Sequence, residues 1–528
     1  MTDEPTAADI RHGINPWLIA ITVTMATFME VLDTSIANIA LPHIAGNLGA
    51  STEEGTWVLT SYLVSAAIVL PLSPWLTNLL GRKRFYMTCV AIFTISSVLC
   101  GLATSLPMLI VFRVMQGAGG GGLQPSEQAI LADTFSEKQR GMAFAIYGVA
   151  VIVAPAIGPT VGGWITDNYS WHWIFFINLP IGLLSLYMTN RIVHDPPWMK
   201  NRNRSGIKHD YIGIALIVLG VGFLQYVLDK GQEDDWFGSR LIVTFSIIAV
   251  ICLTAMVIRE WSHPDPVIDL RLLKKRNFAT AILFSFILGV VLNGSTILIP
   301  QFLQNLLGYT AQRAGLALMP GGFTLMVLMP VAAIAGAKFD RRWVMAFGFA
   351  VTAIGLHHMT GIYLGINFQA AMLLRVVQVI GLPFVFVNIT TMNYVGVPSD
   401  KHNQVSGLSN FSRNIGGAIG VSLLNTFMAR QVQSQRTRLV AHTNHANPFF
   451  QRELDGLTGR FTAMGYSKLS AAQKALAQLS GGVDRQAMVM SYVNAFWLMS
   501  VVVACLVPLV FIMRNPTKAE EKASAGAH

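Results

Sequence analysis

Long apolar segments recur along the whole of this 528-residue chain. A helix of about 20 apolar residues crosses the hydrocarbon core of a bilayer, and it bonds its own backbone groups where no water can do so. Only 12% of the residues are charged, against roughly 25% in soluble domains. The sequence therefore predicts an all-α, polytopic membrane protein.

We expect fourteen transmembrane helices. Their predicted ranges are 15–41, 55–78, 85–103, 107–132, 141–166, 172–192, 211–229, 240–260, 278–304, 313–336, 343–364, 368–394, 405–429 and 488–513. Glu30 and Asp33 interrupt the first apolar segment, so we expect no cleavable signal peptide there. The four cysteines lie in apolar segments without the spacing of paired metal ligands, which predicts neither a disulfide framework nor a metal site.

The formal net charge of +10 comes from basic residues that gather in alternate loops. The main clusters lie at 82–84, 138–140, 200–208, 271–276 and 338–342. Short cytoplasmic loops of membrane proteins carry such an excess of Lys and Arg, and these side chains contact anionic lipid headgroups. The pattern predicts that both termini are cytoplasmic, and it gives no reason to expect a nucleic-acid partner.

A faint internal repeat divides the chain. The run Arg-Val-Met-Gln at 113–116 recurs 262 positions later as Arg-Val-Val-Gln at 375–378, and the loop positions 74 and 78 match 336 and 340 at the same offset. Parallel six-helix halves are a known transporter architecture. We therefore expect two six-helix halves with two inserted helices between them.

The predicted boundaries follow from this repeat. An N-terminal half covers 1–192, a linker with the two inserted helices covers 193–277, and a C-terminal half covers 278–528. The last part contains the long loop 430–487, in which the segment 470–477 is rich in helix-forming residues. This loop is too small for an enzyme domain.

Five motifs identify a family. They are Leu32–Pro42, Gly81-Arg82-Lys83 after the second helix, Arg113 with Gln116-Gly117 in the fourth, Gly158-Pro159-Thr160-Val161-Gly162-Gly163 in the fifth, and Trp171–Pro180. Together they resemble the EmrB-like multidrug exporters, which are fourteen-helix drug:proton antiporters of the major facilitator superfamily. The resemblance covers nearly the whole chain.

The resemblance implies a proton-driven exporter of hydrophobic and amphiphilic toxic compounds in the bacterial inner membrane, working by alternating access and without a cofactor. It implies a periplasmic adaptor of the EmrA kind and a TolC-like outer-membrane channel as partners, with loop 430–487 as a docking surface. It also implies a signature loop and a cavity seal, formed by Gly81, Arg82 and Lys83 and by Gly158, Pro159, Gly162 and Gly163.

Asp33 is the leading candidate for the proton carrier. An ionisable residue at membrane depth is costly and is a candidate functional site by default. Glu30 lies three residues earlier on the same helical face. The alternatives are that Asp33 is a permanently paired, silent acid and that Glu30 only lines a wet cavity.

Arg113 is the expected partner of Asp33. Asp33 precedes Pro42 by nine residues and Arg113 follows Pro107 by six, so both lie roughly 9–14 Å below the outer end of their helices. Arg113 has a purely structural alternative, which is to brace helices through backbone carbonyls. Glu127 is about 21 Å further along the fourth helix, so we expect a second proton station, a group that binds cationic drugs, or a wall of an inward vestibule.

The chain departs from the family loop at two positions. Asn78 stands where the family usually has an acid, and Pro74 stands where it has a glycine. Asp133, at the end of the fourth helix, is our candidate to supply the missing charge to Arg82 or Lys83. The glycine run 117–122 lacks the Gly-Lys-Ser/Thr end of a phosphate-binding loop, which indicates close helix packing and a kink before Pro125.

Three other functions stay open. The chain could be a proton-coupled carrier of a single metabolite such as a siderophore or an amino acid, and substrate competition would separate this case. A passive channel would conduct without proton coupling. A membrane-embedded enzyme is disfavoured because the helices contain no nucleophile–base set and no metal cluster.

Overall fold

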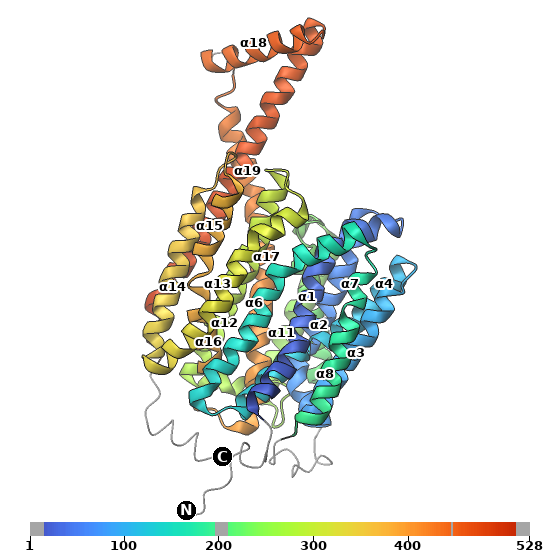
Figure 1. Ribbon diagram of the computed structural model, residues 1–528, viewed down its shortest axis with the longest axis vertical. Coiled ribbons are helices and arrows are strands. Elements are labelled where there is room, and N and C mark those ends of the chain that lie inside the picture. The colour runs from blue at the N-terminus through green and yellow to red at the C-terminus, as the bar shows by residue number, and fades with distance from the viewer. Residues whose placement is uncertain (1–14, 196–209, 445–446, 514–528) are drawn as a thin grey trace, which may run out of the picture.

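The computed structural model describes residues 15–195, 210–444 and 447–513 (Figure 1). Within these ranges the chain is helical and contains no strand, which confirms the all-α prediction. The helices are α1 (Pro16–Asn47), α2 (Thr52–Leu80), α3 (Arg82–Gly101), α4 (Leu106–Gly120), α5 (Leu123–Thr134), α6 (Glu137–Asn168), α7 (Trp173–Phe176), α8 (Asn178–Ile192), α10 (Tyr211–Lys230), α11 (Arg240–Ser262), α12 (Arg276–Asn305), α13 (Ala311–Lys338), α14 (Arg341–His358), α15 (Phe368–Val379), α16 (Leu382–Met392), α17 (His402–Val440), α18 (Pro448–Ala463) and α19 (Lys468–Leu509).

In the described part of the chain, twelve helical segments are long and apolar enough to cross a membrane. Two more predicted crossings correspond to α4 with α5 and to α17, which is compatible with the expected count of fourteen. The predicted helix 107–132 is not continuous, because α4 ends at Gly120 and α5 begins at Leu123. A Cβ on Gly121 would lie 2.4 Å from the carbonyl oxygen of Ala66, so this backbone passes directly against α2.

The predicted halves meet along two seams. The first joins α6 to α13, where a Cβ on Gly315 would lie 2.7 Å from Cβ of Pro159. The second joins α2 to α17, where a Cβ on Gly407 would lie 2.4 Å from Cγ of Pro74. Small residues at these crossings let the helices approach closely. The exact boundaries at 192 and 277 stay predictions.

The inserted helix α10 packs on α2 of the first half. The hydroxyl of Thr60 donates a hydrogen bond to the carboxylate of Asp229, and the ammonium group of Lys230 donates to Thr56. The next helix, α11, packs on α10, where its Phe245 ring lies 4.6 Å from that of Phe223. These contacts fix the inserted pair on the outside of the α2–α17 seam.

The segment 430–487 is not an irregular loop. Helix α17 continues to Val440, α18 covers Pro448–Ala463, and α19 begins at Lys468, so these helices form a projection from the bundle (Figure 1). Arg436 and Asp484 form an ion pair across its base at 2.6 Å. We call the end of the bundle that carries this projection the hairpin end. The opposite end carries Arg82, Arg140 and Lys401, and we call it the basic end.

Candidate functional site

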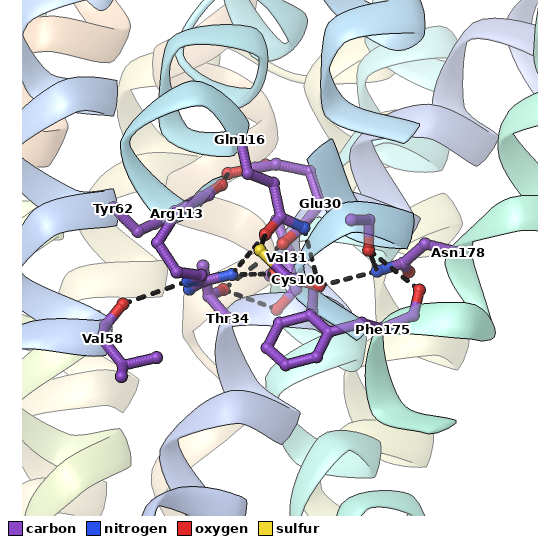
Figure 2. Close-up of polar contacts among 12 residues, drawn as sticks. Glu30, Val31, Thr34, Val58, Tyr62, Cys100, Arg113, Gln116, Phe175 and Asn178 are labelled. Atoms are coloured by element: carbon purple, nitrogen blue, oxygen red, sulfur yellow. Dashed lines mark hydrogen bonds and ion pairs between the residues drawn. The ribbon is translucent and has the colours of Figure 1, made fainter. Parts of the chain in front are cut away.

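Asp33 belongs to a buried polar cluster. Figure 2 shows its partners Arg113, Gln116 and Asn178 pointing toward one another. The Oδ2 atom of Asp33 is 2.7 Å from Nη1 of Arg113. Its Oδ1 atom accepts hydrogen bonds from Nε2 of Gln116 at 3.0 Å and from Nδ2 of Asn178 at 2.6 Å. The exposed fraction is 2% for Asp33 and 0% for Arg113. A carboxylate buried at this depth requires such a set of donors, and both of its oxygens are satisfied here.

Three helices bring these side chains together. Asp33 projects from α1, Arg113 and Gln116 from α4, and Asn178 from the start of α8. Arg113 is itself positioned by its Nε atom, which donates to the carbonyl of Val58 at 3.0 Å. Its guanidinium also lies 4.3 Å from the ring centre of Tyr62, a cation–π distance.

A glycine makes this arrangement possible. A Cβ on Gly117 would lie 2.4 Å from the carbonyl oxygen of Tyr62, so any side chain would push α4 away from α2. The glycine run of α4 therefore serves helix packing, as the sequence predicts. It holds the Arg113 guanidinium within reach of α1.

The expected pairing of Asp33 with Arg113 is present, and it gives the cluster a chemical capability. A carboxylate that is held by a cation and two amide donors changes its bonding when it takes up a proton. The protonated acid loses the charge that attracts Arg113, and one of its oxygens becomes a donor facing other donors. A proton on Asp33 would therefore weaken the contacts of α1 with α4 and α8.

Glu30 belongs to a second polar chain that runs between the two halves. Its Oε1 accepts from the hydroxyl of Tyr62 at 3.1 Å, and its Oε2 accepts from Nε2 of Gln124 at 3.0 Å. The amide oxygen of Gln124 accepts from Nη2 of Arg413 at 2.9 Å. Arg413 lies on α17 in the second half and also donates to the hydroxyl of Tyr147 at 2.6 Å. One amide thus joins a carboxylate in the first half to a guanidinium in the second.

Glu127 is separate from both clusters. It is fully buried on α5, and its Oε1 accepts from the hydroxyl of Thr24 at 2.6 Å. Its Oε2 has no hydrogen-bond partner among the described residues. The sequence-based conclusion that Glu127 does not contact Arg113 agrees with this placement.

At the basic end, Asp133 joins the halves. It forms an ion pair with Arg82 and a second short contact with His402, which begins α17. Arg82 also donates through Nε to Asn403 at 3.0 Å. Asp133 therefore contacts Arg82, as expected, and not Lys83, whose ammonium group donates to the carbonyl of Asn190 at 2.6 Å.

The glycines of α6 pack against α1. A Cβ on Gly158 would lie 2.3 Å from Oγ of Ser35, and one on Gly162 would lie 3.0 Å from Cγ2 of Ile36. Pro159 has no N–H for the carbonyl of Pro155, and the hydroxyl of Ser35 donates to that carbonyl at 3.3 Å instead. Unlike the glycine run of α4, this segment does not break its helix, which continues from Glu137 to Asn168. Gly163 faces Gln312 of α13.

Several polar residues of these clusters were not identified as site residues from the sequence. Asn178 lies within the motif Trp171–Pro180, which assigns it no role, and none of the five motifs contains Gln124, Arg413 or His402. Arg413 carried a signal, because it is an ionisable residue within the predicted transmembrane helix 405–429. The amides, and His402 at the start of α17, carried little, because such residues are common outside functional sites. No group of three metal-ligating side chains occurs in the described ranges.

The comparisons with known proteins agree with this architecture. A family model described as Major Facilitator Superfamily matches residues 23–421. The chain is 37% identical to the multidrug export protein EmrB of Haemophilus influenzae, over 94% of this chain and 96% of that protein. It is 35% identical to EmrB of Escherichia coli K12, over 96% of each.

Two further similarities are informative. The fatty acid resistance protein FarB of Neisseria gonorrhoeae is 34% identical over 94% of this chain and 96% of that protein. Among solved structures, the proton:xylose symporter XylE matches with a TM-score of 0.62 at 15% identity, over 96% of this chain and 98% of that one. At this identity the likeness to XylE shows the fold alone.

Proposed function

We propose that this chain, which belongs to the Major Facilitator Superfamily, exports structurally varied hydrophobic or amphiphilic compounds across the inner membrane in exchange for protons. It is a multi-pass membrane transporter and not an enzyme. The names of the EmrB relatives support multidrug export as its activity. The single observation that carries proton coupling is the buried Asp33 carboxylate in its cluster of donors.

In the proposed cycle, Asp33 takes up a proton from the outer side and the drug leaves. Neutralisation weakens the hold of Arg113, Gln116 and Asn178, because charged hydrogen bonds are about twice as strong as neutral ones. The binding site then opens toward the cytoplasm and Asp33 releases the proton there. The transporter is then ready to bind drug again. One proton crossing 100 mV supplies about 2.3 kcal/mol, enough for more than tenfold accumulation of a neutral substrate.

The cycle also needs a connection between the two halves, and the contacts of Glu30, Gln124 and Arg413 provide one. The Gln124 amide hydrogen-bonds to both side chains, because its N–H donates to Glu30 and its oxygen accepts from Arg413. A proton on Glu30 weakens the first of these bonds and removes the negative charge on that side of the amide. We therefore propose that Glu30 shares in coupling, and that Glu127 is a second proton station closer to the basic end.

We propose that alternating access opens and closes the contacts of Asp133 with His402 and of Arg82 with Asn403 at the basic end. These contacts tie α17 to the first half, so the cavity cannot open at that end while they persist. In this proposal the basic end faces the cytoplasm and both termini are cytoplasmic. The signature loop of Gly81, Arg82 and Lys83 then holds the closed state.

Gly158→Leu should abolish transport. A Cβ at this position would lie only 2.3 Å from Oγ of Ser35. The larger leucine side chain must therefore separate α6 from α1 or lock the two helices in one arrangement. We expect drug resistance to fall to the level of cells without the transporter, with protein still present in the membrane. A resistance level equal to wild type would remove the gate role of Gly158, Pro159, Gly162 and Gly163.

The proposed partners are a periplasmic adaptor of the EmrA kind and a TolC-like outer-membrane channel. The helical projection from α17 to α19 is the candidate docking surface, because it extends away from the bundle (Figure 1). Its tip exposes Phe449, Met464 and Leu469, each at least 70% accessible. Exposed apolar side chains of this kind are typical of protein interaction sites.

Replacement of residues 441–467 by a short Gly/Ser linker should reduce adaptor binding at least tenfold and abolish drug resistance in cells. Transport in liposomes, which needs no partner, should be retained because the Asp33 cluster is untouched. Co-purification with the adaptor measures the first effect. Unchanged adaptor binding and resistance would place the docking surface elsewhere.

Uphill transport of chemically different dyes tests the proposed function. The purified protein in liposomes with a proton gradient should accumulate two unrelated lipophilic dyes, each should compete with the other, and an uncoupler should abolish both. Transport of one metabolite without competition by the dyes would favour the single-metabolite carrier, such as one for a siderophore or an amino acid. Dye flux that does not depend on the proton gradient would indicate a channel.

A further inference from the structure

The second half contains a copy of the Asp33 cluster from which the carboxylate is missing. Arg375 and Gln378 lie 262 positions after Arg113 and Gln116, and their side chains repeat the same contact. Nη1 of Arg375 is 2.5 Å from Oε1 of Gln378, as Nη1 of Arg113 is 2.8 Å from Oε1 of Gln116.

The residue that corresponds to Asp33 is a serine. Position 33 plus the same offset of 262 is Ser295 on α12, and its Oγ is the atom that Nη1 of Arg375 faces, at 3.5 Å. This distance is at the long limit for a hydrogen bond, against 2.7 Å for the pair of Arg113 with Asp33. The repeat therefore holds a neutral hydroxyl where the first half holds a charge.

Two donors of the copied cluster have no acceptor among the described residues. They are Nε of Arg375 and Nε2 of Gln378. In the first half, Nε of Arg113 bonds the carbonyl of Val58 and Nε2 of Gln116 bonds Asp33. The carbonyl that corresponds to Val58 belongs to Pro320, and it accepts from the hydroxyl of Thr324 at 2.8 Å instead.

The burial of Arg375 makes this arrangement costly. Its side chain is 5% exposed, and no ion pair of Arg375 occurs within the described part of the chain. A buried charge without a partner is strongly destabilising, and an ionisable side chain inside a membrane protein is a candidate functional site by default. Gly321 opposes it, and a Cβ there would lie 3.0 Å from Cγ and 3.5 Å from Nε of Arg375.

We propose that Arg375, Gln378 and Ser295 form a binding site for a small monovalent anion. The guanidinium and the amide N–H are two donors without acceptors of the kind that hold a halide or a carboxylate group. The hydroxyl of Ser295 donates to the carbonyl of Leu292 at 3.3 Å, and it supplies a third donor when it turns toward the anion.

The corresponding groups of Arg113 and Gln116 hold the Asp33 carboxylate in the first half, so in this proposal the anion lies beside Ser295 and supplies the missing negative charge. The site is outside the proton-coupling cluster and goes beyond the proposed function.

Two sources supply such an anion: a free halide, or the acid group of an amphiphilic compound. The purified full-length protein is heated in detergent at fixed ionic strength, with sodium chloride or sodium octanoate replacing sodium methanesulfonate. Chloride should raise the melting temperature of wild type saturably by about 2–4 °C, because a ligand that binds only the folded state stabilises it. Ser295→Asp supplies its own carboxylate and should melt higher without chloride and lose this dependence.

The outcomes separate the sources and test the site. An octanoate effect without a chloride effect, again lost in Ser295→Asp, supports the site and assigns it to an acid group. Equal responses of wild type and Ser295→Asp to both anions would overturn the proposal. If Ser295→Asp does not fold, Gln378→Leu removes one donor and should raise the half-saturating anion concentration about tenfold, and an unchanged value would overturn the proposal equally.

Discussion

Asp33→Asn should abolish substrate-driven proton movement. Asparagine preserves the shape of the side chain and one acceptor oxygen, but it carries no titratable proton. In liposomes that contain a pH-sensitive dye, addition of a lipophilic substrate should move protons with wild type and produce less than about 1% of that flux with the variant, since a proton carrier has no substitute at this position. Binding of the dye substrate should remain within a few-fold of wild type.

Two controls make this result specific. Glu30→Gln should reduce the proton flux without abolishing it, because Glu30 acts through the Gln124 amide in our proposal. Glu260→Gln changes a buried carboxylate that bonds the backbone of Ile268, far from the coupling cluster, and should leave the flux unchanged. Flux in Asp33→Asn equal to that of wild type would move coupling to Glu30 or Glu127.

Arg113→Leu should be the most destabilising single substitution at the site. It removes one partner of a fully buried ion pair, which costs about 3–5 kcal/mol because the remaining charge is left uncompensated. Asp33 would keep only its two amide donors. We expect a lower melting temperature and a smaller monodisperse peak in size-exclusion chromatography.

The double variant Asp33→Asn with Arg113→Leu provides the matched comparison. With both charges absent no uncompensated ion is buried, so most of the folded yield should return while transport stays lost. Arg375→Leu is the internal control, since its cluster holds no carboxylate that the substitution could leave unpaired. Equal losses in Arg113→Leu and Arg375→Leu would mean that the charge of Asp33 does not determine the stability of the cluster.

The sequence was sufficient for the parts of the fold that depend on one helix at a time. Apolar length placed the crossings, and helical rise placed Asp33 and Arg113 at similar depths, which led to the pair that the structure contains. The repeat offset also related Arg113 to Arg375. Membership of the superfamily agrees with these expectations.

Other features depend on how helices are rotated against one another, which spacing along one chain does not determine. Gln124 and Arg413 meet across 289 positions, and Asp133 meets His402 across 269. Asn178 contacts Asp33 because it is the first residue of α8, and α8 begins beside Asp33 on α1. The polar composition of segment 430–487 predicts a loop, because the apolar pattern of the transmembrane helices stops there. In the structure, α17 and α19 continue beyond the bundle into this segment.

Direct measurement of proton release on substrate binding tests the central claim, that Asp33 carries the exchanged proton. Purified protein in weakly buffered detergent solution with a pH dye is mixed with a lipophilic substrate, and released protons are counted per transporter. We predict release from wild type, reduced release from Glu30→Gln, and none from Asp33→Asn even where substrate binding is retained. Release from Asp33→Asn equal to that of wild type would contradict the account.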